Sequence, residues 1–128
     1  MSYAITRKTS GEFEAVIGRV KDALKSEGFG VLTEIDVAGT LKTKIGKDFR
    51  PYRILGACNP NLAFEALKEE ANIGVMLPCN VVVQRADNGE VEVSSIDPAT
   101  TMQAVGNPKL SAVADKARAS LKRVIETV

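Results

Sequence analysis

The residues best suited to chemistry lie in the segment Gly56-Ala57-Cys58-Asn59-Pro60. An apolar run typical of a strand ends there and a helix-forming run begins, so Cys58 immediately precedes the unsatisfied N–H groups of a helix. Those donors and the helix dipole favour a thiolate or a bound anion. The segment therefore predicts a reactive or ligand-binding thiol at Cys58, or a helix start that Asn59 and Pro60 explain without any ligand.

A second Cys-Asn pair occurs in Leu77-Pro78-Cys79-Asn80, where Pro78 interrupts a strand ladder and Cys79 opens the next strand. If that strand runs parallel to the one that ends at Cys58, the cysteines start at opposite ends, roughly 15–20 Å apart, and share neither a disulfide nor a metal. If residues 73–77 belong to a longer, bent strand, Cys79 comes close to Cys58 and a shared site forms. The sequence leaves both arrangements open, and the asparagines suit turns as well as binding.

Histidine is absent from the 128 residues. Its absence excludes Ser–His and Cys–His catalytic couples, together with the usual zinc, copper and haem ligand sets. A thiol-dependent enzyme or redox sensor would have to use Cys58 as its nucleophile, with Lys42 or Arg53 lowering the pKa of the thiol. Cys58 and Cys79 would suit a soft metal such as copper(I), provided that a dimer completed the shell. The sequence assigns no cofactor.

A pronounced positive charge marks the segment between Lys42 and Arg53. Its charged residues are Lys42, Lys44, Lys47, Asp48, Arg50 and Arg53. A phosphate or a carboxylate would suit this segment, and a solvated loop would explain it equally well. Phe49 and Tyr52 are too few for stacking on nucleic acid, so no nucleic-acid partner is expected, and they suit a subunit interface instead.

The carboxylates indicate no acid–base pair. Glu34 and Asp36 alternate along one strand, and nothing in the sequence brings Asp36 to Asp97. Asp97 before Pro98 suits a turn or a helix cap. The glycine-rich phosphate motifs are absent, which argues against nucleotide binding of those kinds.

Apolar periodicity and capping residues predict three helices and six strands. A helix runs from a capping box of Thr9 and Glu12 to about residue 27, and further helices cover about 60–71, capped by Asn59, and 108–125, capped by Asn107. The strands are expected at 3–8, 30–36, 40–44, 52–57, 79–85 and 90–96. A tight turn at residues 87–89 should join the last two strands as a hairpin. The order β-α-β-β-β-α-β-β-α predicts an α+β two-layer sandwich, with a mainly antiparallel sheet and helices on one face.

Composition and length predict one domain over residues 1–128. The chain is 45% hydrophobic with a formal net charge of +1, which is ordinary for a globular domain of this size. No apolar run approaches the ~20 residues of a membrane span, and the first residues lack the hydrophobic core of a signal peptide. We therefore expect a cytoplasmic protein with free thiols and no membrane partner.

Several motifs occur in the order that one known family shows. They are Glu34-Ile35-Asp36, Asp48-Phe49-Arg50, the run 52–60, Leu77-Pro78-Cys79-Asn80-Val81 and Ile96-Asp97-Pro98. Over nearly its whole length the chain resembles the domain-of-unknown-function family numbered three hundred and two. The resemblance implies a small α+β domain, homodimers in crystals and no settled biochemical activity. The motif positions carried over here are Asp36, Lys42, Arg53, Cys58, Asn59, Pro60, Pro78, Cys79, Asn80 and Asp97.

These patterns predict a cytoplasmic, homodimeric binding module without catalysis of its own, for a small anionic or thiol-reactive ligand. Its pocket is expected where the Cys58 turn, the Cys79 turn and the segment from Lys42 to Arg53 converge, because a helix N-terminus and a positive segment both favour an anion. The alternative is a thiol-dependent enzyme, or a redox or soft-metal-binding protein, that uses Cys58 and Cys79.

Overall fold

The computed structural model describes residues 2–128, so of the predicted 1–128 domain only Met1 lies outside the described residues. Its strands are β1 (Ala4–Thr9), β2 (Gly30–Asp36), β3 (Tyr52–Cys58), β4 (Cys79–Arg85) and β5 (Val91–Ile96). Its α-helices are α1 (Phe13–Ser26), α2 (Val37–Ile45), α3 (Pro60–Glu69), α4 (Pro98–Thr101) and α5 (Ser111–Thr127). Short 3₁₀ helices are η1 (Ala71–Met76), η2 (Met102–Val105) and η3 (Pro108–Leu110).

The strands form one sheet in the order β1-β5-β4-β3-β2, and every neighbouring pair is antiparallel. The β4–β5 hairpin closes at Gly89, which has a φ of 87° and supplies the left-handed conformation that the turn needs. This confirms the hairpin predicted at residues 87–89.

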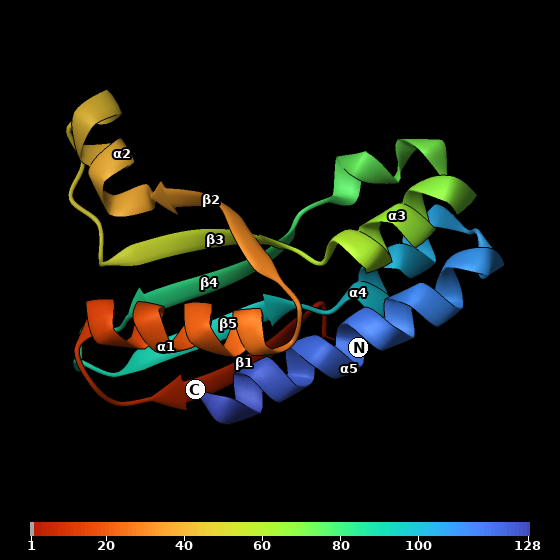
Figure 1. Cartoon of the computed structure of the whole chain (residues 1–128). Helices are drawn as coiled ribbons and strands as arrows, with labels where there is room; N and C mark the ends of the chain where they lie inside the picture. Colours follow the sequence, from red (N-terminus) through yellow and green to blue (C-terminus); the bar gives the residue numbers. More distant parts are fainter. Residues whose placement is uncertain (1) are drawn as a thin grey trace.

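The main core lies between the sheet and two helices. Figure 1 shows α1 and α5 lying against one face of the sheet. Alternate residues of the central strands point into that face, as strand geometry requires, and pack against the apolar stripes of both helices. Buried members of this core are Val16, Val20, Leu24, Leu55, Val81, Val83, Val91, Val93, Leu121 and Val124.

A smaller core lies beyond the end of the sheet, where α3 packs on η1, η2, η3 and the start of α5. Its buried residues are Ala66, Ile73, Met102, Leu110, Val113 and Ala114. Figure 1 shows this lobe at one end of the molecule and α2 at the other. β3 runs between them, so its first residues lie near α2 and its last residues near α3.

The α+β class with an antiparallel sheet is confirmed, but one predicted strand is wrong. Residues 40–44 belong to α2 rather than to a strand. The side chain of Asp36 accepts a hydrogen bond from the Gly39 N–H, and Gly46 ends the helix in the left-handed conformation. These two caps fix a helical turn locally, and they outweigh the strand preference of the intervening threonines.

Two helix starts also differ from the prediction. Thr9 ends β1 opposite Val91, and α1 begins at Phe13 after Glu12, which makes no side-chain capping bond, so the Thr9–Glu12 capping box is wrong. Asn107 does cap a helical turn, by accepting from the Lys109 N–H, but that turn is η3 and α5 itself starts at Ser111.

Candidate functional site

The two cysteines lie at the same end of the sheet. Cys58 is the last residue of β3 and Cys79 the first of β4, and the antiparallel register places Ala57 directly opposite Cys79. The separation expected for parallel strands is therefore wrong. The bent strand over residues 73–77 is also wrong, because η1 covers residues 71–76. Strand direction brings the two cysteines to the same end of the sheet.

Cys58 and Cys79 both line one apolar cavity of about 30 Å³ between the end of the sheet, α3 and α5. Its walls are largely hydrocarbon, and they are formed by Phe29, Ala57, Leu62, Ala63, Ala66, Leu77, Pro78, Met102, Val113 and Ala117 together with Asn59 and the two cysteines. A water molecule needs about 10–15 Å³ of such space and several polar partners. The cavity therefore suits a ligand of one or a few atoms, not a metabolite.

Cys58 and Cys79 are free thiols in different surroundings. Cys58 is partly exposed, whereas Cys79 is 9% exposed. Burial, with a smaller contribution from the nearby Cys58, raises the pKa of the Cys79 thiol to about 11. Cys79 is therefore protonated at neutral pH, because desolvation disfavours the thiolate.

Gly56 allows the chain to pack closely beside the cavity. A Cβ at this position would overlap the Thr33 Oγ1 and lie 2.8 Å from the Pro78 Cγ. Pro78 itself lines the cavity. Asn80 pairs with Gly56 across the sheet and is exposed on the strand. Asn80 therefore shares this end of the sheet with the thiols, but it is not among the residues that line the cavity.

The start of α3 is capped by its own sequence. The Asn59 Oδ1 accepts from the N–H groups of Asn61 and Leu62, and the Asn59 carbonyl accepts from the Ala63 N–H. Pro60 has no N–H to offer. The donors that an anion would need at this helix start are already bonded, so the helix-initiation interpretation of Asn59 and Pro60 accounts for these contacts.

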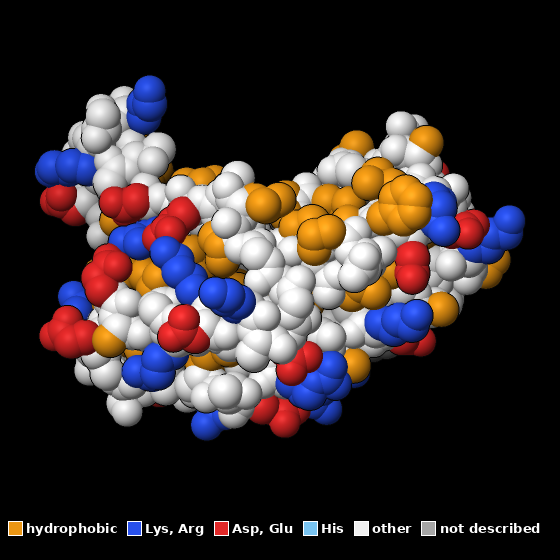
Figure 2. Space-filling view, in the orientation of Figure 1, with side chains coloured by type: hydrophobic (Ala, Val, Ile, Leu, Met, Phe, Trp, Pro, Cys, Tyr) orange, Lys and Arg blue, Asp and Glu red, His pale blue; other side chains and the backbone are white. Residues whose placement is uncertain are grey.

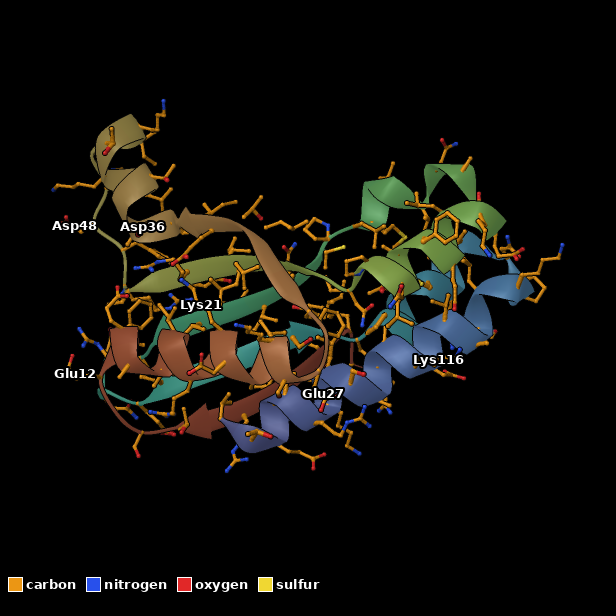
Figure 3. All side chains as sticks on the ribbon, viewed as in Figure 1. Glu12, Lys21, Glu27, Asp36, Asp48 and Lys116 are labelled. Atoms are coloured by element: carbon orange, nitrogen blue, oxygen red, sulfur yellow. The ribbon has the colours of Figure 1, made fainter. Side chains whose placement is uncertain are left out.

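Asp36, Lys42 and Arg53 lie at the opposite end of β3 from the thiols. Asp36 pairs with Arg53 across β2 and β3, and five residues of strand, about 17 Å, separate Arg53 from Cys58. Lys42 on α2 forms an exposed ion pair of 2.9 Å with Asp48. The labelled side chains of Asp36 and Asp48 in Figure 3 lie at the α2 end. The expected convergence of the basic segment with the cysteine turns is therefore wrong.

Arg53 is held in an ion-pair network that joins β3 to β2 and α1. Its guanidinium donates to Glu34 at 2.6 Å and to Glu14 at 2.7 Å, and Lys21 lies 2.7 Å from Glu34. Hydrogen bonds from Lys21 and from Arg53 lower the pKa of the Glu34 carboxyl. The Arg53 Nε is buried without a hydrogen-bond partner. These contacts assign Arg53 a structural role.

Asp97 also makes structural contacts. Its carboxylate accepts from the N–H groups of Ala99 and Thr100 and from the Arg118 Nε at 3.0 Å. It therefore caps α4 and links that helix to α5, in agreement with the cap interpretation.

Comparison with protein families matches the model described as "Domain of unknown function DUF302" over residues 5–128. This chain belongs to the DUF302 family. The resemblance predicted from the motifs is thereby confirmed. The family's function is not known.

A solved DUF302 structure has the same fold. The crystal structure of an uncharacterized conserved DUF302 protein from Bacillus stearothermophilus is 30% identical in sequence, with a TM-score of 0.93, over 99% of this chain and 98% of that one. No curated protein sequence matches this DUF302 chain. Within residues 2–128, none of the helices has the length and apolar character needed to cross a bilayer.

Apart from Pro78, sequence reasoning missed the apolar residues that line this DUF302 cavity, Met102 among them. Met102, 9% exposed, lines it from η2, more than forty residues after Cys58 and more than twenty after Cys79. Its local sequence, Thr-Thr-Met-Gln, carries no binding signal. The tertiary fold brings Met102 to the cavity wall beside residues of α3 and α5.

Proposed function

We propose that this protein is a small binding module that holds a thiol-reactive ligand through Cys58 and Cys79. The observation that carries the proposal is that both free cysteines line one apolar cavity. The cavity, about 30 Å³, is far smaller than the roughly 300–1,000 Å³ of ordinary metabolite sites. The ligand is therefore a group of one or a few atoms with affinity for sulfur.

The contacts favour this ligand over a simple anion. The N–H groups at the start of α3 are bonded to Asn59, and Arg53 is paired with Glu14 and Glu34. Lys42 and Arg53 lie at the far end of β3, so neither supports the alternative in which one of them activates Cys58 for catalysis. We propose a cytoplasmic location for the protein, because a reducing compartment keeps both thiols reduced and able to bind a ligand.

Methyl methanethiosulfonate, a small uncharged reagent that modifies thiols, tests the proposal. We expect Cys58 to gain one methylthio group in the native protein and Cys79 to react only slowly, because Cys79 is buried and protonated at neutral pH. Peptide mass spectrometry over time, in native protein and in urea, measures both rates. A Cys58→Ala variant is the matched control and should show almost no early modification.

Two results would contradict the proposal. If Cys58 reacted only after unfolding, no ligand could enter the cavity. If phosphate or sulfate raised the melting temperature while the thiol reagent left both cysteines untouched, the ligand would be an anion bound elsewhere, since a ligand that binds the native state must stabilise it.

We also propose that the partner of this chain is a second copy of itself. β2 pairs with β3 on one side only, and its other edge is exposed. Figure 2 shows hydrophobic side chains gathered around a hollow between α2 and the α3–η1 lobe. Large exposed residues of β2 and this lobe are Leu32, Ile35, Phe64, Leu67 and Val75. An apolar surface of this kind, next to an open strand edge, favours association.

Charge supports a two-fold arrangement of these surfaces. The α2 end is net basic, with Lys42, Lys44 and Lys47 against Asp48, and the α3 end is net acidic, with Glu65, Glu69 and Glu70 against Lys68. In a symmetric dimer, α2 of each copy can face α3 of the other, because a two-fold interface joins the same two surfaces twice. The basic helix then meets the acidic one at both contacts.

Sedimentation equilibrium tests the dimer. We expect a mass twice the 13.7 kDa of one chain, and a shift toward the monomer in Leu32→Lys and in Val75→Asp. Tyr3→Lys, at an exposed residue outside the surface defined above, is the control and should leave the mass unchanged. A wild-type chain that remained monomeric at high micromolar concentration would refute the proposal.

A further inference from the structure

Three sulfur-containing residues from three separate elements line the apolar cavity. Cys58 comes from the end of β3, Cys79 from the start of β4 and Met102 from the start of η2. The rest of the wall is hydrocarbon apart from Asn59, whose side-chain oxygen is already bonded to the start of α3. A ligand inside this cavity is therefore surrounded by sulfur-containing and hydrocarbon side chains.

Two thiolates and a thioether form a soft ligand set. Soft sulfur ligands select copper(I), whereas magnesium and calcium require oxygen, and structural zinc sites use four ligands. Residues 2–128 contain no cluster of three His, Cys, Asp or Glu side chains, as a magnesium, calcium or zinc site would need. A volume of about 30 Å³ fits one metal ion.

We infer that this cavity is a copper(I) site, in which Cys58 and Cys79 bind the ion as thiolates and Met102 as a thioether. The inference rests on the proposed function, because it names the ligand that the two thiols take up. The third ligand comes from the same chain, so no second copy is needed to complete the shell. Binding is an exchange of protons for metal: two S–H bonds break, two copper–sulfur bonds to thiolate form, two protons leave to solvent and no electron is transferred.

The surroundings compensate part of the resulting charge. One copper(I) ion and two thiolates leave one net negative charge, and α3 begins two residues after Cys58 with the positive end of its dipole near the cavity. Because each thiol gives up its proton when it binds the ion as a thiolate, apparent affinity for copper(I) should rise with pH.

Competition with the copper(I) chelator bicinchoninate, under reducing and oxygen-free conditions, tests the inference. We expect one copper(I) per chain, and Cys58→Ala or Cys79→Ala to abolish competition. Met102→Leu preserves side-chain volume and should weaken binding about tenfold, at the low end of the losses seen when a metal site is altered. Met76→Leu is the matched control, because Met76 packs in the smaller core outside the cavity wall, and it should bind as the wild type does.

X-ray absorption spectroscopy distinguishes a Met102 that binds copper from a Met102 that only supports the fold. The copper should have three sulfur neighbours in the wild type and two in Met102→Leu. Circular dichroism of each variant without copper establishes that it is folded, and Met102→Leu keeps the test decisive if an alanine variant does not fold.

Three outcomes would overturn the inference. They are no competition by the wild type, equal affinity in Met102→Leu and wild type, and one copper shared by two chains through the partly exposed Cys58. If copper(I) failed to bind while methyl methanethiosulfonate still modified native Cys58, the metal assignment alone would be wrong and the thiol-binding function would stand.

Discussion

Gly56 shows how one missing side chain shapes the site. Its Cα faces Thr33 on one neighbouring strand and Pro78 beside the other, and each would overlap any Cβ placed there. Because Pro78 also borders the cavity that contains Cys79, the close approach at Gly56 sets the position of that cavity wall. The backbone φ of Gly56 is not positive, so its conformation does not require glycine. Glycine is required because a Cβ would come too close to Thr33 and Pro78.

Gly56→Ala should lower the free energy of unfolding by about 1–3 kcal/mol, because extra volume in a tightly packed place forces its neighbours apart. Urea denaturation followed by circular dichroism measures the change. Gly18→Ala is the control: no atom lies within 4 Å of its Cβ position, and alanine in a helix should stabilise by about 0.5–1 kcal/mol. Equal stability of Gly56→Ala and wild type would mean that Thr33 and Pro78 move freely.

At the level of elements, short local signals fix where helices begin and end. Asp36, Asn59 and Asp97 each cap a helix with a side-chain oxygen. The cap matters most for α2, whose residues are all exposed or half-buried, because little tertiary packing supports that helix.

Asp36→Ala should destabilise α2 by about 1 kcal/mol, since it removes the acceptor of the Gly39 N–H. Hydrogen exchange should accelerate at the amides of α2 and remain unchanged in α1 and α5. The control is Asp48→Ala, which removes only an exposed ion pair with Lys42 and should have little effect. Unchanged exchange in α2 after loss of the cap would show that contacts with β2 and β3 hold the helix.

At the scale of the whole molecule, Glu34 joins α1, β2 and β3 through Lys21 and Arg53. The folded protein lowers the pKa of Glu34 below its ordinary value of 4.5. A carboxyl of this kind stabilises the fold above pH 4.5, and the contribution disappears as the pH falls through the lowered pKa of the folded state.

Glu34→Gln should therefore cost about 1 kcal/mol at pH 7, and its difference from the wild type should shrink as the pH is lowered from 4.5 toward 2. Urea denaturation at several pH values measures both free energies. Gly18→Ala removes no titrating group, so its effect should be the same at every pH. A Glu34→Gln difference that persisted undiminished at low pH would arise from packing rather than from charge.

The sequence by itself determined the local features. Helical periodicity located α1, α3 and α5, and the turn at residues 87–89 located the β4–β5 hairpin. Asn59 and Asp97 were recognisable as caps. These features depend on neighbours within a few residues, where backbone sterics and short-range hydrogen bonds decide the outcome. The strand predicted at residues 40–44 is wrong for the same reason, because the caps at Asp36 and Gly46 outweigh the strand preference of the threonines between them.

Only the tertiary structure decided which of the predicted site residues meet. The antiparallel pairing of β3 with β4 brings Cys58 to Cys79, and it leaves Arg53 at the far end of the same strand. Packing of η2 adds Met102 to the cavity. Strand partners and helix packing depend on burial of apolar faces across the whole chain, so the spacing of two cysteines in the sequence cannot reveal whether they share a site.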